Sequence, residues 1–230
     1  MSAIIEMRDV RRTYKRGGET LNVLDGLDLT LEAGEFVALM GPSGSGKSTI
    51  LNLVGGLDRA DGGTITVAGD DITKMATGKL PAWRAQHIGF VFQSFNLVPV
   101  LTAQENVMLP LLLTSLSRAE RRKQAEFALE IVGLADRRNH RPRQLSGGQE
   151  QRVAIARAIA SDPKLVLADE PTGDLDRESA TAVKDLLQRL NEELGKTFVI
   201  VTHDPLVGER AGKCLHLDKG VLTDVTVASA

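Results

Sequence analysis

Residues 36–49 read FVALMGPSGSGKST, an apolar run that leads straight into a glycine-rich loop. The run at 36–40 is apolar throughout, which is typical of a strand buried on both faces of a sheet. The loop matches the pattern G-x-x-x-x-G-K-[ST] at every fixed position, a match that chance gives about once in a hundred chains of this length. The segment therefore predicts a strand, a phosphate-binding loop and a helix in succession. The alternative is a tight strand-to-helix turn that binds nothing.

Each residue type in this loop suits a polyphosphate. Glycines let backbone N–H groups come close to phosphate oxygens. Lys47 can neutralise charge on the β- and γ-phosphates, Ser48 offers a hydroxyl to Mg²⁺, and the following helix points its positive end at the anion. The predicted nucleotide-binding residues of the loop are Gly41, Pro42, Ser43, Gly44, Ser45, Gly46, Lys47, Ser48 and Thr49.

The composition of the chain excludes several classes of protein. Its 230 residues suffice for one domain with a full core, and the 42% hydrophobic and 25% charged content is that of a globular protein. The net charge of −2 gives no reason to expect a nucleic-acid partner. No apolar stretch is long enough to span a bilayer, and the N-terminus lacks the apolar core of a secretory signal. Cys214 is the single cysteine, so we expect a buried thiol in a reducing compartment.

Apolar runs elsewhere in the chain extend the predicted sheet. Residues 88–92, 165–168 and 198–201 resemble 36–40, and helical segments separate them. This order implies a mostly parallel α/β core. Residues 28–31 and 64–67 instead alternate polar and apolar side chains, as half-buried strands do.

The middle of the chain is predicted to be helical. Two capping-box patterns begin at Thr102 and Ser117, and the second is followed by an apolar stripe that Gly133 ends. A further helix is expected at 177–194, with a buried face formed by Val183, Leu187, Leu190 and Leu194.

A pair of carboxylates follows the apolar run 165–168. Asp169 and Glu170 stand where a central strand would end, the edge at which open α/β sheets bind ligands. We expect Asp169 to support Mg²⁺ through water, and Glu170 to orient and deprotonate an attacking water. The alternative is that both residues cap the turn at 171–173. The phosphate loop in the same chain favours the catalytic interpretation.

The sequence LSGGQ at 145–149 is the third motif, and a helix is expected after it at 151–160. Free N–H groups and the Ser146 hydroxyl would form a second anion site at that helix start. A flexible Ser-Gly turn is the alternative, but chance produces this string less than about once in a thousand chains. With these three motifs in this order, the chain resembles the ATP-binding cassette (ABC) family along essentially its whole length.

The resemblance implies a fold and its organisation. It implies a P-loop NTPase core with a mostly parallel sheet, an N-terminal antiparallel β subdomain and an inserted α-helical subdomain. Residues 1–230 are then one ABC domain, with the α/β core and the antiparallel part at 1–93 and 161–230. The helical lobe is expected at 94–160, where it carries the LSGGQ signature.

The resemblance also implies roles for single residues. Tyr14 matches the aromatic residue that stacks on adenine, Gln93 the glutamine that senses Mg²⁺ or the attacking water, and His203 the histidine that contacts the γ-phosphate. Asp174 lies in the loop that crosses the dimer interface. The implied catalytic residues are Glu170, His203 and Gln93. The implied Mg²⁺ residues are Ser48, Gln93 and Asp169. The implied signature contacts to nucleotide are Ser146, Gly147, Gly148 and Gln149.

In this family two cassettes close head to tail around two ATP molecules, so the resemblance implies a homodimer with ATP and Mg²⁺ as ligands. Segments at 55–58, 95–99, 139–142 and 171–176 resemble the branch of lipoprotein-release and macrolide-export ATPases. That branch more often has Asn where Asp174 stands. A separate membrane permease is implied, with docking expected at 95–101 because that run is unusually apolar for a loop. The alternative is that the run packs into the helical lobe. The expected location is cytoplasmic, at the inner face of the cell membrane.

The main alternative is a soluble ABC-type ATPase that acts on nucleic acid or ribosomes. Nucleic-acid ATPases of this type insert a long coiled coil or carry zinc-binding cysteines, and the ribosomal type has two cassettes in one chain. The compact middle and the single cysteine favour the transporter interpretation.

Overall fold

The computed structural model describes residues 3–17 and 19–226. The chain forms two compact units, one made of residues 1–80 and 196–230 and the other of residues 81–195. Each unit is described by itself. The predicted division into a core and a lobe at 94–160 stays a prediction.

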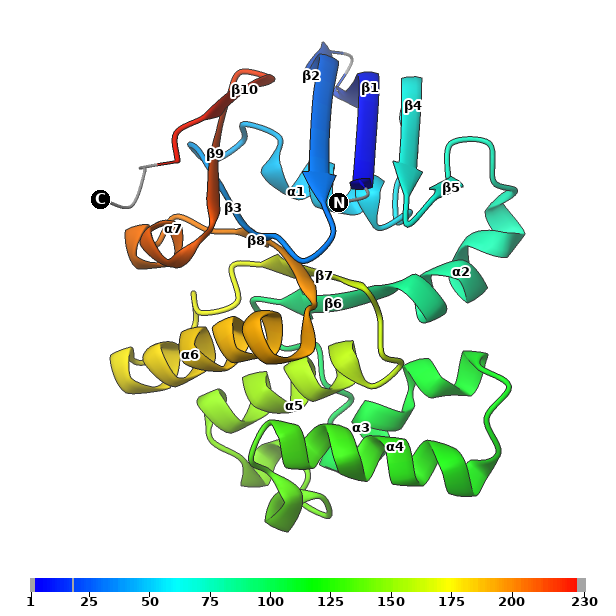
Figure 1. Cartoon of the computed structure of the whole chain (residues 1–230), viewed down its shortest axis with the longest axis vertical. Helices are drawn as coiled ribbons and strands as arrows, with labels where there is room; N and C mark the ends of the chain where they lie inside the picture. Colours follow the sequence, from blue (N-terminus) through cyan, green and yellow to red (C-terminus); the bar gives the residue numbers. More distant parts are fainter. Residues whose placement is uncertain (1–2, 18, 227–230) are drawn as a thin grey trace. The chain divides into compact units, whose positions relative to one another are not determined.

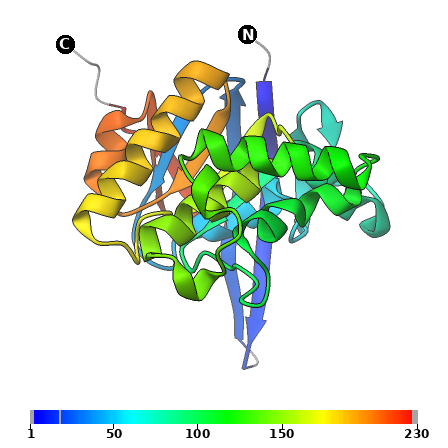
Figure 2. The ribbon, with the colours of Figure 1, turned by 90° about the horizontal axis from the view of Figure 1, so that it is seen from below.

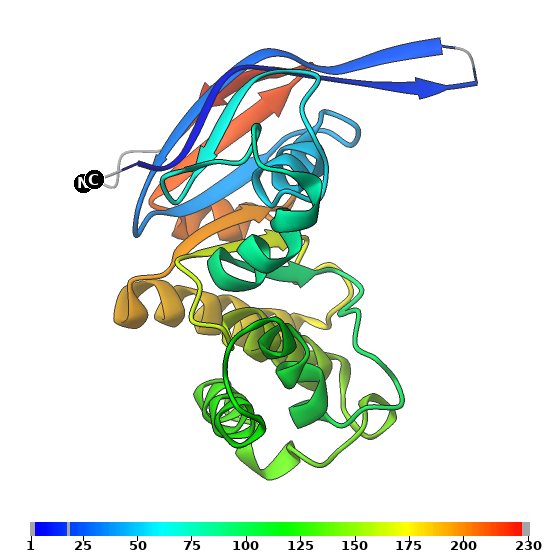
Figure 3. The same cartoon turned by 90° about the vertical axis from the view of Figure 1, so that its right-hand side faces the viewer.

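The first unit contains a four-stranded antiparallel sheet in the order β2-β1-β4-β5. Its strands are β1 (Ala3–Arg16), β2 (Glu19–Glu32), β4 (Gly62–Val67) and β5 (Asp70–Asp71). β4 pairs with β1 as far as Arg11, and β1 continues beside β2 to Arg16. Figure 3 shows this continuation as a two-stranded blue hairpin that runs past β4.

The same unit contains parallel strands in the order β10-β9-β3-β8. β3 (Phe36–Met40) runs parallel to β8 (Thr197–Val201) and to β9 (Lys213–Asp218), and β10 (Val221–Asp224) closes the edge antiparallel to β9. Helix α1 (Lys47–Val54) contacts both β4 and β8, while α7 (Pro205–Arg210) contacts β3 and β9. Burial of apolar side chains from both sheets is the main stabilising term of this unit.

The second unit has two parallel strands covered by helices. β6 (Ile88–Phe92) pairs with β7 (Leu165–Asp169), with Phe90 opposite Leu167. Its helices are α2 (Leu80–His87), α3 (Ala103–Met108), α4 (Arg118–Ile131), α5 (Gly147–Ile159) and α6 (Arg177–Leu194). α5 lies at the centre, in contact with β6, α3, α4 and α6 (Figures 1 and 2).

The strand and capping predictions are confirmed. The apolar runs at 36–40 and 88–92 are β3 and β6, and both capping boxes are formed. Two expectations were wrong. The helix expected at 151–160 begins at Gly147, because Ser146 caps it, and Leu194 is 47% exposed because it lies at the last turn of α6.

Of the helices in the part of the chain that the structure describes, none combines the length and the apolar character that a membrane crossing requires.

Candidate functional site

The phosphate loop follows β3 and ends at α1, as predicted. Gly41, Gly44 and Gly46 have φ of 141°, 79° and 106°, values that L side chains rarely adopt. A Cβ on Gly46 would come within 3.0 Å of Val23 Cγ1 on β2. Glycine at position 46 is therefore favoured both by the backbone conformation and by the close approach of the Val23 side chain.

Two polar side chains face the interior of this loop. Lys47 Nζ donates to the carbonyl oxygens of Gly41 and Pro42, both at 2.8 Å. An ammonium group has three donors, so one N–H remains for an anion. Ser45 is buried, and within the described residues its Oγ has no hydrogen-bond partner. The loop thus offers an ammonium, a hydroxyl and the N-terminus of α1 to one small volume.

His203 lies at the same edge of the parallel strands as the phosphate loop. Leu39 of β3 is opposite Val201 of β8, and Thr202 N donates to Leu39 O at 3.2 Å. Two residues further along each parallel strand lie Gly41 and His203. The register therefore places this imidazole at the carboxyl end of the strands, where the loop begins.

Tyr14 is fixed by side chains from the segment that follows α1. Its hydroxyl donates to Asp58 Oδ2 at 2.6 Å. The Arg12 guanidinium binds both oxygens of Asp58 at 2.8 and 3.0 Å, and it also lies over the Tyr14 ring, 4.6 Å from its centroid. The sequence patterns gave no indication of this cluster, because Asp58 is 44 positions from Tyr14 and 46 from Arg12.

The charges of the cluster reinforce one another. Burial disfavours the Asp58 carboxylate, but the hydrogen bonds from Tyr14 and the Arg59 backbone and the charge of Arg12 outweigh it, so the pKa of Asp58 is lowered. Burial also opposes the Arg12 charge, yet its contacts with Tyr14, Asp58 and Asp61 raise the pKa of that guanidinium. Both groups are therefore ionised at neutral pH.

The carboxyl ends of β6 and β7 gather the predicted catalytic residues of the second unit. Phe92 lies opposite Asp169 in the parallel register, so Gln93 and Glu170 follow at the same edge. Glu170 has φ of 46°, which is uncommon for a residue other than glycine and occurs often at functional sites. The structure thus brings Gln93, Asp169 and Glu170 to one strand edge.

Gln93 is held by the loop that follows the carboxylate pair. Its Nε2 donates to Asp174 Oδ1 at 2.8 Å. A Cβ on Gly173 would lie 3.0 Å from the same amide nitrogen, so the loop and the glutamine are in close contact. Since a carboxylate accepts but does not donate, this bond fixes which side of the amide faces Asp174.

The signature segment forms the beginning of α5. Ser146 is its N-cap and accepts from Gln149 N, while the Gln149 side chain accepts from Ser146 N. A Cβ on Gly148 would lie 2.6 Å from Ser179 Oγ, whereas one on Gly147 would meet nothing nearer than 3.7 Å. Gly148 therefore serves close packing on α6, and Gly147 leaves the helix start open.

Gln151 is a positioning residue that the sequence patterns did not reveal. It is fully buried, and its Nε2 donates to Phe92 O and Pro171 O. It therefore connects α5 to the ends of both strands that carry the catalytic candidates. One signal in the sequence could have revealed it. Gln151 is a polar residue two positions after LSGGQ, on a helix face that is buried.

The expected docking run at 95–101 is held in place from within its own unit. Phe95 and Asn96 have positive φ of 54° and 51°, and Arg157 donates to both of their carbonyl oxygens. Buried Asn106 binds backbone groups of Val98, Leu101 and Thr102. Val100 remains 72% exposed at the tip.

A pocket of about 390 Å³ lies beside this run. Its apolar walls include Phe92, Pro110 and Leu113, and two guanidinium groups, those of Arg84 and Arg157, also line it. Burial lowers the pKa of both arginines. The pocket therefore combines apolar surface with partly desolvated positive charge.

The predicted Mg²⁺ residues belong to different units, with Ser48 in the first and Gln93 and Asp169 in the second. In neither part of the described chain do three or more His, Cys, Asp or Glu side chains gather as metal ligands. A shared Mg²⁺ position for these three residues stays a prediction.

Comparisons with known proteins agree with this geometry. A family model described as ABC transporter matches residues 24–173. The uncharacterized ABC transporter ATP-binding protein YknY of Bacillus subtilis is 50% identical, over 94% of each chain. The lipoprotein-releasing system ATP-binding protein LolD of Idiomarina loihiensis is 44% identical over 96% of each chain. The macrolide export protein MacB of Rhodopirellula baltica is 47% identical over 96% of this chain, which spans 33% of MacB.

A solved structure has the same fold. It is the ATP-binding cassette MJ0796, a dimer in a post-hydrolysis state bound to ADP and Pi, with a TM-score of 0.86 and 44% identity. The alignment covers 96% of this chain and 98% of the other. The predicted family and fold class are confirmed by these matches. The chain belongs to the ABC transporter family, in the class of its ATP-binding cassettes.

Proposed function

We propose that this chain is the ATP-hydrolysing subunit of an ABC transporter, and that two copies close around two ATP molecules to drive a separate permease. The phosphate loop is the observation that carries the proposal. It combines left-handed glycines, an ammonium that bridges two loop carbonyls and a helix N-terminus. That combination suits the β- and γ-phosphates of a nucleotide.

The side chains of the predicted Mg²⁺ residues offer oxygen atoms, and Mg²⁺ prefers hard oxygen ligands. The hydroxyl of Ser48, the carboxylate of Asp169 and the amide oxygen of Gln93 would hold it. The amide nitrogen of Gln93 is already bound to Asp174, so the amide oxygen is the atom left for a metal or a water. When bound, Mg²⁺ would neutralise charge that develops on the phosphates.

Glu170, His203 and Tyr14 each have one role in this proposal. Glu170 accepts a proton from the attacking water and orients it. His203, at the strand edge beside the phosphate loop, contacts the γ-phosphate. Tyr14 stacks on the base.

We propose that the LSGGQ segment at 145–149, called the signature turn, completes the nucleotide site of a second copy. Ser146 and the N–H groups at the start of α5 form an anion site that is separate in sequence from the phosphate loop. The related cassette MJ0796 forms dimers in its solved structures. A two-fold pair of this chain would place each signature turn on the nucleotide of the other copy.

The proposed permease contact is the pocket beside residues 95–101. Its apolar walls suit a short apolar segment, and Arg84 and Arg157 suit an acidic side chain on that segment. We propose that a cytoplasmic segment of the permease with one carboxylate occupies it. The cassette would then be held at the inner face of the membrane by the permease alone.

Substitution of Glu170 by Gln tests the proposal. The variant should bind ATP with wild-type affinity, hydrolyse it at least a hundredfold more slowly, and accumulate as an ATP-dependent dimer in size-exclusion chromatography with light scattering. Lys47→Ala is the matched control, because it should lose ATP binding and therefore should not accumulate as a stable dimer. A Glu170→Gln protein that hydrolyses ATP at the wild-type rate as a monomer would refute the proposed mechanism.

A further inference from the structure

We propose that Asp58 is a positioning residue for the nucleotide base. It holds Tyr14 and Arg12 so that one face of the tyrosine ring is covered and the other is presented to the base. It also ties this platform to the helix that begins at the phosphate loop. The inference rests on the proposed function, because it assigns a support to the base-stacking role of Tyr14.

The contacts of Asp58 account for both of its carboxylate oxygens. Oδ2 accepts from the Tyr14 hydroxyl at 2.6 Å and from Arg12 Nε at 3.0 Å, and Oδ1 accepts from Arg12 at 2.8 Å. The Arg12 and Asp58 side chains are 19% and 26% exposed, so water screens their attraction only in part. Hydrogen bonds between ionised groups are shorter and about twice as strong as neutral ones.

A second carboxylate braces the same strand. Asp61 binds Arg12 at 2.9 Å and accepts from both the backbone N–H and the hydroxyl of Thr13. Of these two carboxylates, it is Asp58 that accepts from the Tyr14 hydroxyl. The two carboxylates therefore have separable roles, since Asp61 fixes the strand and Arg12 while Asp58 also fixes the aromatic ring.

The position of Arg12 determines how a base can approach. Its guanidinium lies 4.6 Å from the ring centroid, over one face of Tyr14. A base can therefore stack only on the opposite face. Because the tyrosine hydroxyl gives its one proton to Asp58, it cannot donate a hydrogen bond to the nucleotide, and the ring contributes stacking.

Asp58 also connects the platform to the phosphate loop. Leu57 N and Asp58 N both donate to Asn52 O on α1, at 2.8 and 3.1 Å. α1 begins at Lys47 of the loop and ends at Val54. A short rigid helix thus lies between the carboxylate that fixes the aromatic ring and the residues that hold phosphate.

The test compares a ligand that has a base with one that has only phosphates. Binding of ADP and of inorganic pyrophosphate is measured by isothermal titration calorimetry, and neither ligand is hydrolysed. Asp58→Ala should bind ADP about tenfold more weakly, the size of a lost aromatic–base stack, while its pyrophosphate affinity stays at the wild-type value. Asp58→Asn keeps the volume of the side chain, and its affinity for ADP should lie between those of the wild type and Asp58→Ala.

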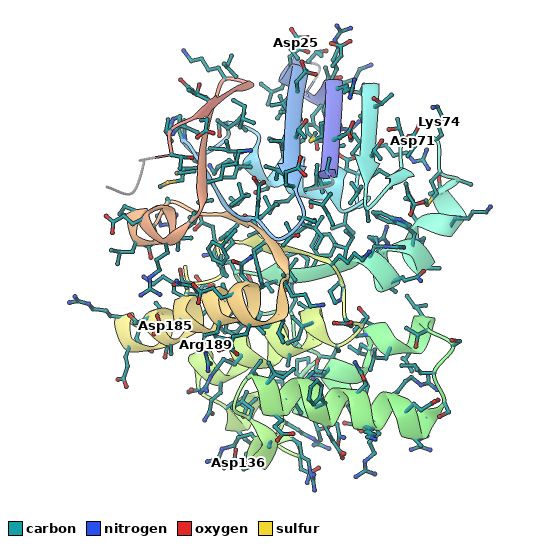
Figure 4. All side chains as sticks on the ribbon, viewed as in Figure 1. Asp25, Asp71, Lys74, Asp136, Asp185 and Arg189 are labelled. Carbon is teal, nitrogen blue, oxygen red and sulfur yellow. The ribbon has the colours of Figure 1, made fainter. Side chains whose placement is uncertain are left out.

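The control is Asp71→Asn in the same unit. Asp71 forms an ion pair with Lys74 at 2.7 Å, and Figure 4 shows these two labelled side chains near each other. This change removes the same charge without touching Tyr14 or Arg12, and it should alter neither affinity. Tyr14→Ala should weaken ADP binding by the same factor as Asp58→Ala, and the double variant should be no weaker than either single one.

The outcomes separate this inference from the proposed function. If Asp58→Ala binds ADP as the wild type does, or loses ADP and pyrophosphate equally, Asp58 is not a positioning residue for the base. If the losses of ADP binding free energy caused by Asp58→Ala and by Tyr14→Ala simply add in the double variant, the two residues act independently and the inference also fails. Wild-type protein that binds neither ligand would instead overturn the phosphate site, and the inference with it.

Discussion

The side-chain amide of Gln93 has a defined orientation because its partner is a carboxylate. Asp174 can only accept, so Gln93 presents its NH₂ group to Asp174 at 2.8 Å and keeps its oxygen for another ligand. An asparagine at position 174 could accept or donate, and it would allow the glutamine to bind in either orientation. The aspartate at position 174 therefore fixes the orientation of the Gln93 amide.

Substitutions at position 174 should show this effect on turnover. Asp174→Ala should lower kcat severalfold with little change in the KM for ATP, because Gln93 loses its anchor while nucleotide contacts remain. Asp174→Asn should lower kcat about twofold at most, since one of two amide orientations stays productive. Steady-state ATPase assays decide between these values, and an Asp174→Ala enzyme with wild-type kcat would show that the bond has no role in catalysis.

Cys214 should be almost unreactive in the folded protein. It is 9% exposed, and its Sγ lies 3.6 Å from Met40 Sδ. Burial, and secondarily the charge of Asp224, raise the pKa of the thiol. Since the thiolate is the reactive form, a raised pKa reduces the reactive fraction at any pH below it.

Reaction with a disulfide reagent at pH 8 measures this protection. The folded chain should react at least about tenfold more slowly than the same chain in urea. The single cysteine makes the signal unambiguous. Equal rates in the folded and unfolded states would mean that the sheet opens readily around β9 in solution.

At the scale of elements, α5 packs on α6 through a position that tolerates only glycine. A Cβ on Gly148 would lie 2.6 Å from Ser179 Oγ and 2.8 Å from Ser179 Cβ, which is closer than real contacts allow. Gly148→Ala should therefore destabilise the protein by about 1–3 kcal/mol through overpacking.

Gly147→Ala is the matched control for this prediction. A Cβ there would meet only Leu175 at 3.7 Å and Phe95 at 3.8 Å, which are ordinary contacts. Urea unfolding of the nucleotide-free proteins should place Gly147→Ala at or above wild-type stability, because alanine favours a helix. If the two variants have the same midpoint, the close approach of α5 to α6 does not contribute to stability.

The elements that could be predicted from the sequence carry local signals. Residues 36–40 and 88–92 are apolar throughout and become β3 and β6, and the capping boxes at Thr102 and Ser117 begin helices as expected. The start of α5 was expected four residues too late, because Gly147-Gly148 reads as a turn. The capping box from Ser146 to Gln149 was the local signal that outweighs the two glycines.

The local structure of the candidate site was predictable where a motif fixes the spacing, as at 41–49 and 169–170, while the roles of these residues stay predictions. The supports of the site were not predictable in this way. Tyr14 and Asp58 are 44 positions apart, and Gln151 reaches Phe92 across 59 positions. Such pairs depend on how strands and helices pack, and no local pattern of residue types encodes them.

At the scale of the whole molecule, the proposed permease contact depends on positive charge in an apolar pocket. Arg84→Glu should reduce recovery of the permease with the cassette about tenfold, because it places like charges together in a partly desolvated pocket. ATP affinity should not change. Arg189→Glu on α6, labelled in Figure 4, is the control in the same unit.

Co-purification from detergent-solubilised host membranes measures this effect. Each variant carries the same affinity tag, and the bound membrane protein is quantified by mass spectrometry. An Arg84→Glu cassette that recovers as much permease as the wild type would place the docking surface elsewhere.

The shared site proposed for two copies predicts rescue between inactive variants. Lys47→Ala has a defective phosphate loop and an intact signature turn. Gly147→Glu has the reverse, because a carboxylate at the start of α5 repels phosphate, while an acidic residue at a helix N-terminus should not disturb folding. Each protein alone should be nearly inactive, since every site in its dimer contains one defective half.

Mixing the two variants in equal amounts should restore ATPase activity. Half of the dimers would then be mixed, and each mixed dimer would have one site in which both halves are intact. Activity should approach about a quarter of the wild-type value if that single site works alone, and it should stay lower if the two sites must act together. A mixture no more active than its components, despite mixed dimers detected by tag pull-down, would show that each copy binds and hydrolyses ATP with its own residues only.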